Sequence, residues 1–212
     1  VVIGRPVRFG DVQGVIGIKA VHLTTAAERR TMPKTKDLYI DIGAASKAAA
    51  EDKVSLGDYG VFDSAVVEFG DGLIKAKAID DRVGCAALLK LIEDEPPIDT
   101  WFCFTVQEEV GLRGAGAAAY AIEPDLNISL DVTGTGDTPK CGRMSVKLGA
   151  GATVKVMDSS VIVPPVVRAF LAEAADEKNI RWQPEVLRAG GTDTGAVQRA
   201  RGGILSGCIS IP

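Results

Sequence analysis

The stretch TWFCFTVQEEVGLRGA, residues 100–115, joins an apolar run to two adjacent carboxylates. The run from Trp101 to Val106 is typical of a buried strand, and Glu108 and Glu109 follow it almost directly. Neighbouring carboxylates repel each other, and burial makes each charge more costly. The stretch therefore predicts either a positive partner or the transfer of a proton at the end of this strand.

On both sides of this stretch, residues 77–212 alternate between apolar runs and helical patterns. The segment IDTWFCFTV (98–106) and the segments LNISLDV, RWQPEVL and GGILSGCISI predict strands. Helices are predicted for DDRVGCAALLKLIED, GAGAAAYAI, PPVVRAFLAEAADEKN and TDTGAVQRA. Strands that alternate with helices indicate an α/β layered domain.

Residues 1–76 show a different pattern, in which glycines separate short apolar runs. VQGVIGIKAVHL, DLYIDIG, DYGVFDSAVVEFG and GLIKAKAID predict strands, and TTAAERRTM and AASKAAAED predict short helices. We therefore expect a small β-rich module over residues 1–76 and an α/β domain over residues 77–212.

The composition limits the classes of function. The 212 residues carry a net charge of −4 and only 5% are aromatic, so we expect no nucleic-acid partner. No leader or bilayer-length apolar run is recognisable, so we expect neither secretion nor membrane spanning. The four cysteines form no CxxC pair, which predicts a reduced, cytoplasmic protein without a thiolate metal site.

Three acidic sites each follow an apolar run. Asp80 and Asp81 follow LIKAKAI, Glu108 and Glu109 follow the strand described above, and Asp131 follows LNISL. Ligands of α/β sheets collect at the carboxyl ends of strands, so Asp80, Glu109 and Asp131 are expected to converge there. One or two divalent cations would remove the repulsion between them. For each residue alone, a helix cap, a solvated side chain or a turn explains the position as well.

The chain resembles the tetrahedral and glutamyl aminopeptidase family of two-metal peptidases over essentially its whole length. The resemblance lies in KAIDDRVG, QEEVG, SLDVTGTGDTP and GGTDTG, in this order. It implies two divalent ions, zinc or cobalt, with Asp80 as the bridging ligand and Glu109 and Asp131 each binding one ion. Glu108 would then be the general base that takes a proton from the attacking water.

The same resemblance implies a substrate and an assembly. Substrates would be peptides that lose their N-terminal residue by hydrolysis, with the preferred residue left open. Gly190, Gly191 and Asp193 would lie near the substrate, although a tight turn capped by the aspartate explains GGTDTG equally well. The β-rich module would be inserted into a zinc-peptidase-like sheet domain, and dimers would assemble into a larger homo-oligomer.

One feature departs from the family pattern. The family has two ligand histidines, whereas the single histidine here, His22, falls within the β-rich module. We expect both histidine segments to lie beyond the ends of this chain, which start and stop within strands and leave the α/β domain incomplete. With three carboxylates alone, the 212 residues are expected to bind hard cations weakly and to lack aminopeptidase activity.

Two other functions remain open. A metal-poor relative could keep the fold and act as a non-catalytic assembly or binding protein. A glycosidase also uses two carboxylates, but these lie about 5–9.5 Å apart across the sugar. Adjacent Glu108 and Glu109, and the scarcity of aromatic residues, fit a glycosidase poorly.

Overall fold

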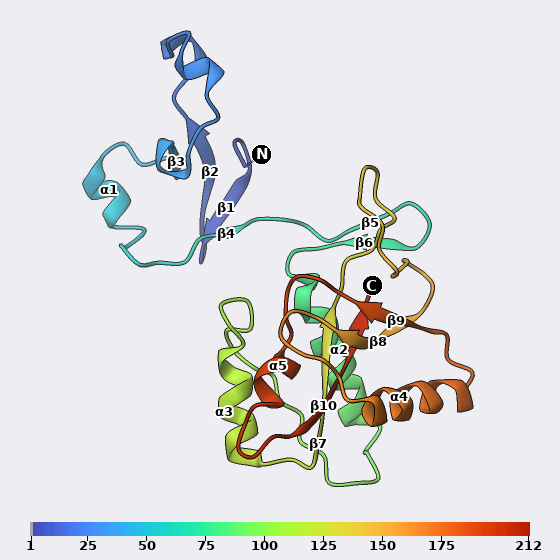
Figure 1. The fold of residues 1–212 in the computed structure, drawn as a ribbon. Helices are drawn as coiled ribbons and strands as arrows, with labels where there is room; N and C mark the ends of the chain where they lie inside the picture. The colour runs from blue at the N-terminus through green and yellow to red at the C-terminus, as the bar shows by residue number, and fades with distance from the viewer. Residues whose placement is uncertain (1) are drawn as a thin grey trace. The chain divides into compact units, whose positions relative to one another are not determined.

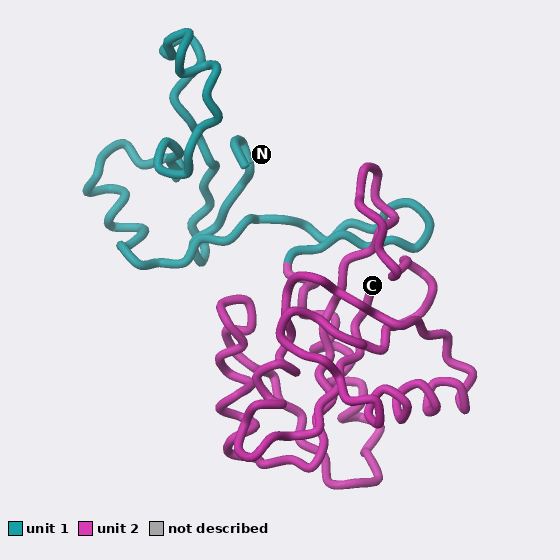
Figure 2. Tube along the Cα trace, viewed as in Figure 1, with its two compact units in different colours: residues 1–77 teal, residues 78–212 magenta. Residues whose placement is uncertain are grey.

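A computed structural model describes residues 2–212. The chain divides into two compact units, Val1–Lys77 and Ala78–Pro212 (Figure 2). The division falls where glycine-punctuated short strands give way to alternating strands and helices. None of the helices within the described residues has the length and apolar character needed to cross a bilayer.

The first unit contains a four-stranded antiparallel sheet in the order β3-β2-β1-β4 (Figure 1). Its strands are β1 (Pro6–Phe9), β2 (Val12–Ile18), β3 (Leu38–Asp41) and β4 (Val61–Phe62). The strands β5 (Val67–Phe69) and β6 (Leu73–Lys75) form a separate hairpin. The helix α1 (Lys47–Glu51) begins after Ser46, whose hydroxyl accepts a hydrogen bond from the Ala49 amide at 3.2 Å.

The helix predicted over residues 24–32 is wrong, because the segment forms only one 3₁₀ turn, η2 (Glu28–Arg30). Two further 3₁₀ turns, η1 (Val21–Leu23) and η3 (Thr35–Asp37), lie before and after it. Thr25 and Glu28 exchange side-chain-to-backbone hydrogen bonds of 2.6 and 3.2 Å, which closes a single turn. Pro33 then prevents the turn from continuing as an α-helix.

The second unit is the α/β layered fold that the sequence predicts, built on a mixed sheet in the order β7-β10-β8-β9. The strands are β7 (Leu126–Val132), β8 (Ala152–Met157), β9 (Trp182–Val186) and β10 (Leu205–Ile211). β10 runs parallel to β7 and antiparallel to β8, and β8 runs parallel to β9. Pro184 is tolerated within β9 because this strand lies at the edge of the sheet.

Four helices pack around this sheet (Figure 1). They are α2 (Ile79–Glu93), α3 (Arg113–Ile122), α4 (Pro165–Glu177) and α5 (Asp193–Val197). Val161, Val163 and Val167 form one buried cluster, and α3 and α5 share a second cluster through Ala115, Ala119 and Val197. Gly207 of β10 allows α4 to approach the sheet, since a Cβ there would lie 2.6 Å from Val167 Cγ1.

The strand predicted over residues 98–106 is not formed. No neighbouring strand pairs with this segment within the described residues, so its backbone groups have no ladder to join. Its apolar side chains are accordingly exposed, Trp101 by 72% and Val106 by 67%. An apolar run predicts a strand only where another strand supplies the hydrogen bonds.

Candidate active site

Asp80 and Asp81 lie at the start of α2, where the backbone is not yet helical. Their φ/ψ values are −79°/109° and −116°/51°. The Asp81 carboxylate accepts a hydrogen bond from the Gly84 amide at 3.1 Å, so Asp81 caps the first regular turn. The capping role therefore belongs to Asp81, and Asp80 remains exposed beside it.

Glu108 and Glu109 lie in a tight turn rather than at the end of a strand. The amides of Gly111 and Leu112 both donate to the Glu108 carbonyl, at 3.0 and 2.9 Å. The Gly114 amide closes the loop onto the Val106 carbonyl at 3.0 Å, at the beginning of α3. This turn leaves Glu108 half-buried and Glu109 exposed.

Asp131 is the sixth of the seven residues of β7 and pairs in register with Ser210 of β10. Its Oδ1 accepts a hydrogen bond from the Val132 amide at 2.7 Å. Of the three predicted metal ligands, only Asp131 lies in a strand. Glu109 lies in the turn after residue 106, and Asp80 lies in the irregular start of α2.

The GGTDTG segment lies between β9 and β10. Asp193 begins α5, and its Oδ2 accepts a hydrogen bond from Thr105 Oγ1 at 2.5 Å. Its Oδ1 is buried and has no hydrogen-bond partner within residues 2–212. This contact connects GGTDTG to the segment that leads into Glu108. Gly190 has a φ of +84°, which favours glycine, and its carbonyl accepts hydrogen bonds from Ser159.

The pKa of Glu108 is raised to about 7. Burial is the largest cause, and the negative charges of Asp193, Glu109, Asp80 and Asp81 add to it. A carboxyl group with this pKa exchanges its proton near neutral pH, as a general base requires. This pKa makes Glu108 suited to proton transfer.

The pKa of Asp131 is also raised to about 7. Burial again dominates, the Val132 amide lowers the pKa, and Glu108, Asp81 and Asp80 raise it. Burial together with Asp80 and Asp193 likewise raises the pKa of Asp81. The fold thus brings acidic side chains from α2, the loop before α3, β7 and α5 within electrostatic reach of one another.

This carboxylate cluster lacks a cationic partner in the part of the chain that the structure describes. None of the ion pairs in residues 2–212 includes Asp80, Asp131, Asp193 or the Glu108–Glu109 pair. An uncompensated group of carboxylates suits a divalent cation, which prefers oxygen ligands. In the same residues, however, no three His, Cys, Asp or Glu side chains form a group that could hold a metal. The donor chemistry fits a cation, but these side chains do not complete a coordination shell.

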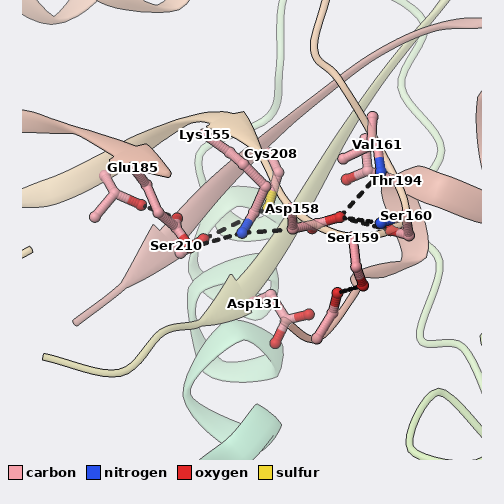
Figure 3. Close-up of polar contacts among 12 residues, drawn as sticks. Asp131, Lys155, Asp158, Ser159, Ser160, Val161, Glu185, Thr194, Cys208 and Ser210 are labelled. Carbon is pink, nitrogen blue, oxygen red and sulfur yellow. Dashed lines mark hydrogen bonds and ion pairs between the residues drawn. The ribbon is translucent and has the colours of Figure 1, made fainter. Parts of the chain in front are cut away.

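Lys155, Asp158 and Glu185 form a buried charge cluster close to GGTDTG that was not predicted from the sequence (Figure 3). Two signals could have revealed it. Lys155 interrupts the apolar strand ATVKVM, and Glu185 interrupts WQPEV in the neighbouring strand. A charged residue in each of two adjacent apolar strands predicts an ion pair between them.

The chain resembles several known proteins over nearly its whole length. A "Putative aminopeptidase" of Acetivibrio thermocellus is 47% identical over 212 residues, which cover 99% of this chain and 63% of the relative. An aminopeptidase from the archaeon Desulfurococcus kamchatkensis superposes with a TM-score of 0.90 at 36% identity, covering 100% of this chain and 61% of that one. The TET1 peptidase of Pyrococcus horikoshii superposes with a TM-score of 0.82 at 32% identity, covering 100% and 64%.

The chain spans less than two thirds of the length of each of these proteins. The family model for M42 glutamyl aminopeptidases matches residues 3–212. That match includes the irregular start of α2, the Glu108–Glu109 turn, Asp131 and GGTDTG, the four places from which the carboxylate cluster is built. The chain therefore belongs to the M42 glutamyl aminopeptidase family.

Proposed function

We propose that this chain forms the catalytic part of a metal-dependent aminopeptidase that hydrolyses N-terminal residues from peptides. The observation that carries the proposal is the cluster of acidic side chains around Glu108, which is itself half-buried and has a pKa raised to about 7. Proton transfer is most efficient when the pKa of the general base lies close to the working pH. Family membership supports the same activity.

Asp80, Glu109 and Asp131 are the proposed metal ligands, with Asp80 in the bridging position. Since the described side chains do not complete a shell, the remaining ligands would come from parts of the whole protein outside these 212 residues. Histidine ligands there would favour zinc or cobalt over harder cations. When bound, two such ions would polarise the scissile carbonyl and make water a stronger nucleophile.

Glu108 takes the proton from the attacking water and later delivers it to the amine of the leaving peptide. Asp193, which is not among the proposed metal ligands, would attract the ammonium group of a free peptide N-terminus, which distinguishes an aminopeptidase substrate from an internal peptide bond. Gly190, Gly191 and Asp193 are the residues proposed to contact the substrate.

The first unit is the proposed oligomerisation module. Its described strands bury little apolar surface, and Met32, Leu56 and Tyr59 are almost fully exposed. Exposed apolar residues of this kind suit a protein–protein contact. The TET1 peptidase described above assembles into a tetrahedron or a large octahedral shell, which supports a large homo-oligomer here as well. The four free cysteines support a reducing, cytoplasmic location.

Two variants of the complete protein test the proposed roles. Glu108→Gln keeps the shape of the side chain but removes the base, so kcat for an amino-acid anilide should fall by roughly 10²–10⁴-fold. Metal content, measured by elemental analysis, should stay unchanged in this variant. Glu109→Gln should lose metal together with activity.

Equal metal loss in both variants would show that the roles of the two glutamates are misassigned. A wild-type protein that binds metal but cleaves no peptide or anilide would contradict the aminopeptidase proposal. A wild-type protein without either property would identify a non-catalytic assembly protein instead. Release of sugar from a glycan substrate would identify a glycosidase.

A further inference from the structure

A buried charge cluster joins β8 and β9 (Figure 3). Lys155 lies directly opposite Glu185 in the parallel pair, and its Nζ is 2.6 Å from Glu185 Oε1 and 3.5 Å from Asp158 Oδ2. The side chains of Lys155, Asp158 and Glu185 are exposed by 0%, 0% and 1%. None of these three side chains is among the proposed metal ligands or the proposed general base.

Glu185 is held by hydrogen bonds on more than one side. Thr153 Oγ1 donates to its Oε2 at 2.6 Å, and the Ser210 hydroxyl also donates to this carboxylate. Burial alone raises the pKa of Glu185, but the hydrogen bonds from Lys155, Thr153 and Ser210 together lower it below its ordinary value. Lys155 is therefore paired with a carboxylate that is both ionised and fixed in place.

Asp158 links Lys155 to a turn. Its Oδ2 faces the ammonium group, while its Oδ1 accepts hydrogen bonds from the Ser160 amide at 2.7 Å, the Ser160 hydroxyl at 2.8 Å and the Val161 amide at 3.0 Å. One carboxylate thus binds the charged cluster and fixes the conformation of residues 158–161. Figure 3 shows these contacts converging on Asp158.

The turn is in direct contact with GGTDTG. The Ser159 amide donates to the Gly190 carbonyl at 3.2 Å, and the Ser159 hydroxyl donates to the same oxygen. Gly191 and Gly195 lie so close to Ser160 that a Cβ on Gly191 would be 3.0 Å from Ser160 Oγ, and a Cβ on Gly195 would overlap this side chain. The turn therefore packs directly against residues 190–195.

We infer that Lys155, Glu185 and Asp158 act as positioning residues that hold the GGTDTG segment, and Asp193 within it, at the proposed active site. This inference rests on the proposed function, because the segment matters to catalysis only if Glu108 is the base. Well-packed apolar residues stabilise a core at least as well as a buried ion group does. Asp158, however, accepts hydrogen bonds from Ser160 and Val161, and these bonds hold the turn in one conformation. Apolar residues could not make these hydrogen bonds.

The test compares two variants of the complete, metal-loaded protein by amide hydrogen exchange and steady-state kinetics. Asp158→Ala removes the turn contacts, so exchange of the amides of residues 190–195 should rise at least tenfold and kcat/KM should fall roughly ten- to a hundredfold. Asp158→Asn keeps the oxygen that accepts from residues 160 and 161, so it should restore most of the protection in residues 190–195.

Thr153→Val is the matched control. It removes one hydrogen bond from Glu185 at a buried position but leaves the turn contacts intact, so it should lower Tm without changing exchange at residues 190–195. If Asp158→Ala does not fold, Ser159→Ala removes only one contact with Gly190 and should raise exchange in the same segment.

Hydrogen exchange separates this inference from the proposed function. Increased exchange at residues 190–195 in Asp158→Ala, in a protein without peptidase activity, would support positioning of the segment and refute the proposed function. Unchanged exchange and unchanged kcat/KM would overturn the inference, as would an equal rise in exchange with Thr153→Val.

Discussion

Replacing Lys155 by methionine isolates the contribution of its charge to stability. Methionine keeps much of the apolar stem, so the change leaves Glu185 and Asp158 without their buried cation while adding little empty volume. Removal of one partner from a buried ion pair costs about 3–5 kcal/mol. The three side chains are at most 1% exposed, so water does not reduce this cost. A loss of about 3–5 kcal/mol is a large part of the roughly 5–15 kcal/mol that stabilises a typical domain.

Urea unfolding of the complete protein measures this loss. With an m-value of about 1–3 kcal/mol/M, the midpoint should fall by at least about 1 M. Trp182 of β9, whose Nε1 donates to Asp176 Oδ1 at 2.8 Å, provides a fluorescence probe in the strand that carries Glu185.

Two control variants determine whether the charge itself is responsible. Lys155→Met/Glu185→Gln removes both charges of the closer pair and should recover a substantial part of the lost stability. Lys90→Met removes an exposed lysine that pairs with Glu93 and Asp94, and should change stability by less than about 1 kcal/mol. If Lys155→Met is as stable as Lys90→Met, or if the double variant is no more stable than Lys155→Met alone, the charge of Lys155 does not stabilise the fold.

Two further predictions concern pH and packing. Because the pKa of Glu185 is lowered from 4.5, its contribution to stability is complete above that value and is lost as the pH falls through the folded-state pKa. Unfolding free energies measured from pH 6 down to pH 3 should therefore decline more steeply in the wild type than in Lys155→Met/Glu185→Gln, and parallel declines would contradict this. Gly207→Ala should lower the free energy of unfolding by about 1–3 kcal/mol, because the added Cβ would collide with Val167. Gly202→Ala, which has open space around its Cβ, should change it very little, and thermal unfolding of both variants measures the difference.

The elements that the sequence predicts well are those whose side chains carry a clear local pattern. The prolines before Val166 and the apolar spacing after them predict α4, and the apolar runs predict β7, β9 and β10. The segment 98–106 has an equally clear pattern but forms no strand, because a strand also needs a neighbour and none is available within the described residues. β8 was not predicted, since Lys155 breaks the apolar run that would have marked it.

For the candidate site, the sequence predicts the residues better than the elements that carry them. The order of Asp80, Glu108, Glu109 and Asp131 along the chain, each after an apolar run, was enough to select them and to indicate a resemblance to metallopeptidases. These residues were expected at the ends of strands, but only Asp131 lies near the end of one. The capping role of Asp81 depends on an irregular backbone at the start of α2, which a local sequence pattern does not reveal.

The motifs and the apolar runs of the sequence indicate the family, the α/β character of the second unit and the acidic residues of the candidate site. Three features become visible only in the folded chain: which of these carboxylates influence one another, the contact between Thr105 and Asp193, and the pairing of Lys155 with Glu185. Thr105 and Asp193 are 88 residues apart in sequence, and Lys155 and Glu185 are 30 apart. The spacing of apolar residues along a helix or strand indicates which of its faces is buried. The pairing of charges between elements depends on strand register and burial, which arise only when distant segments pack together.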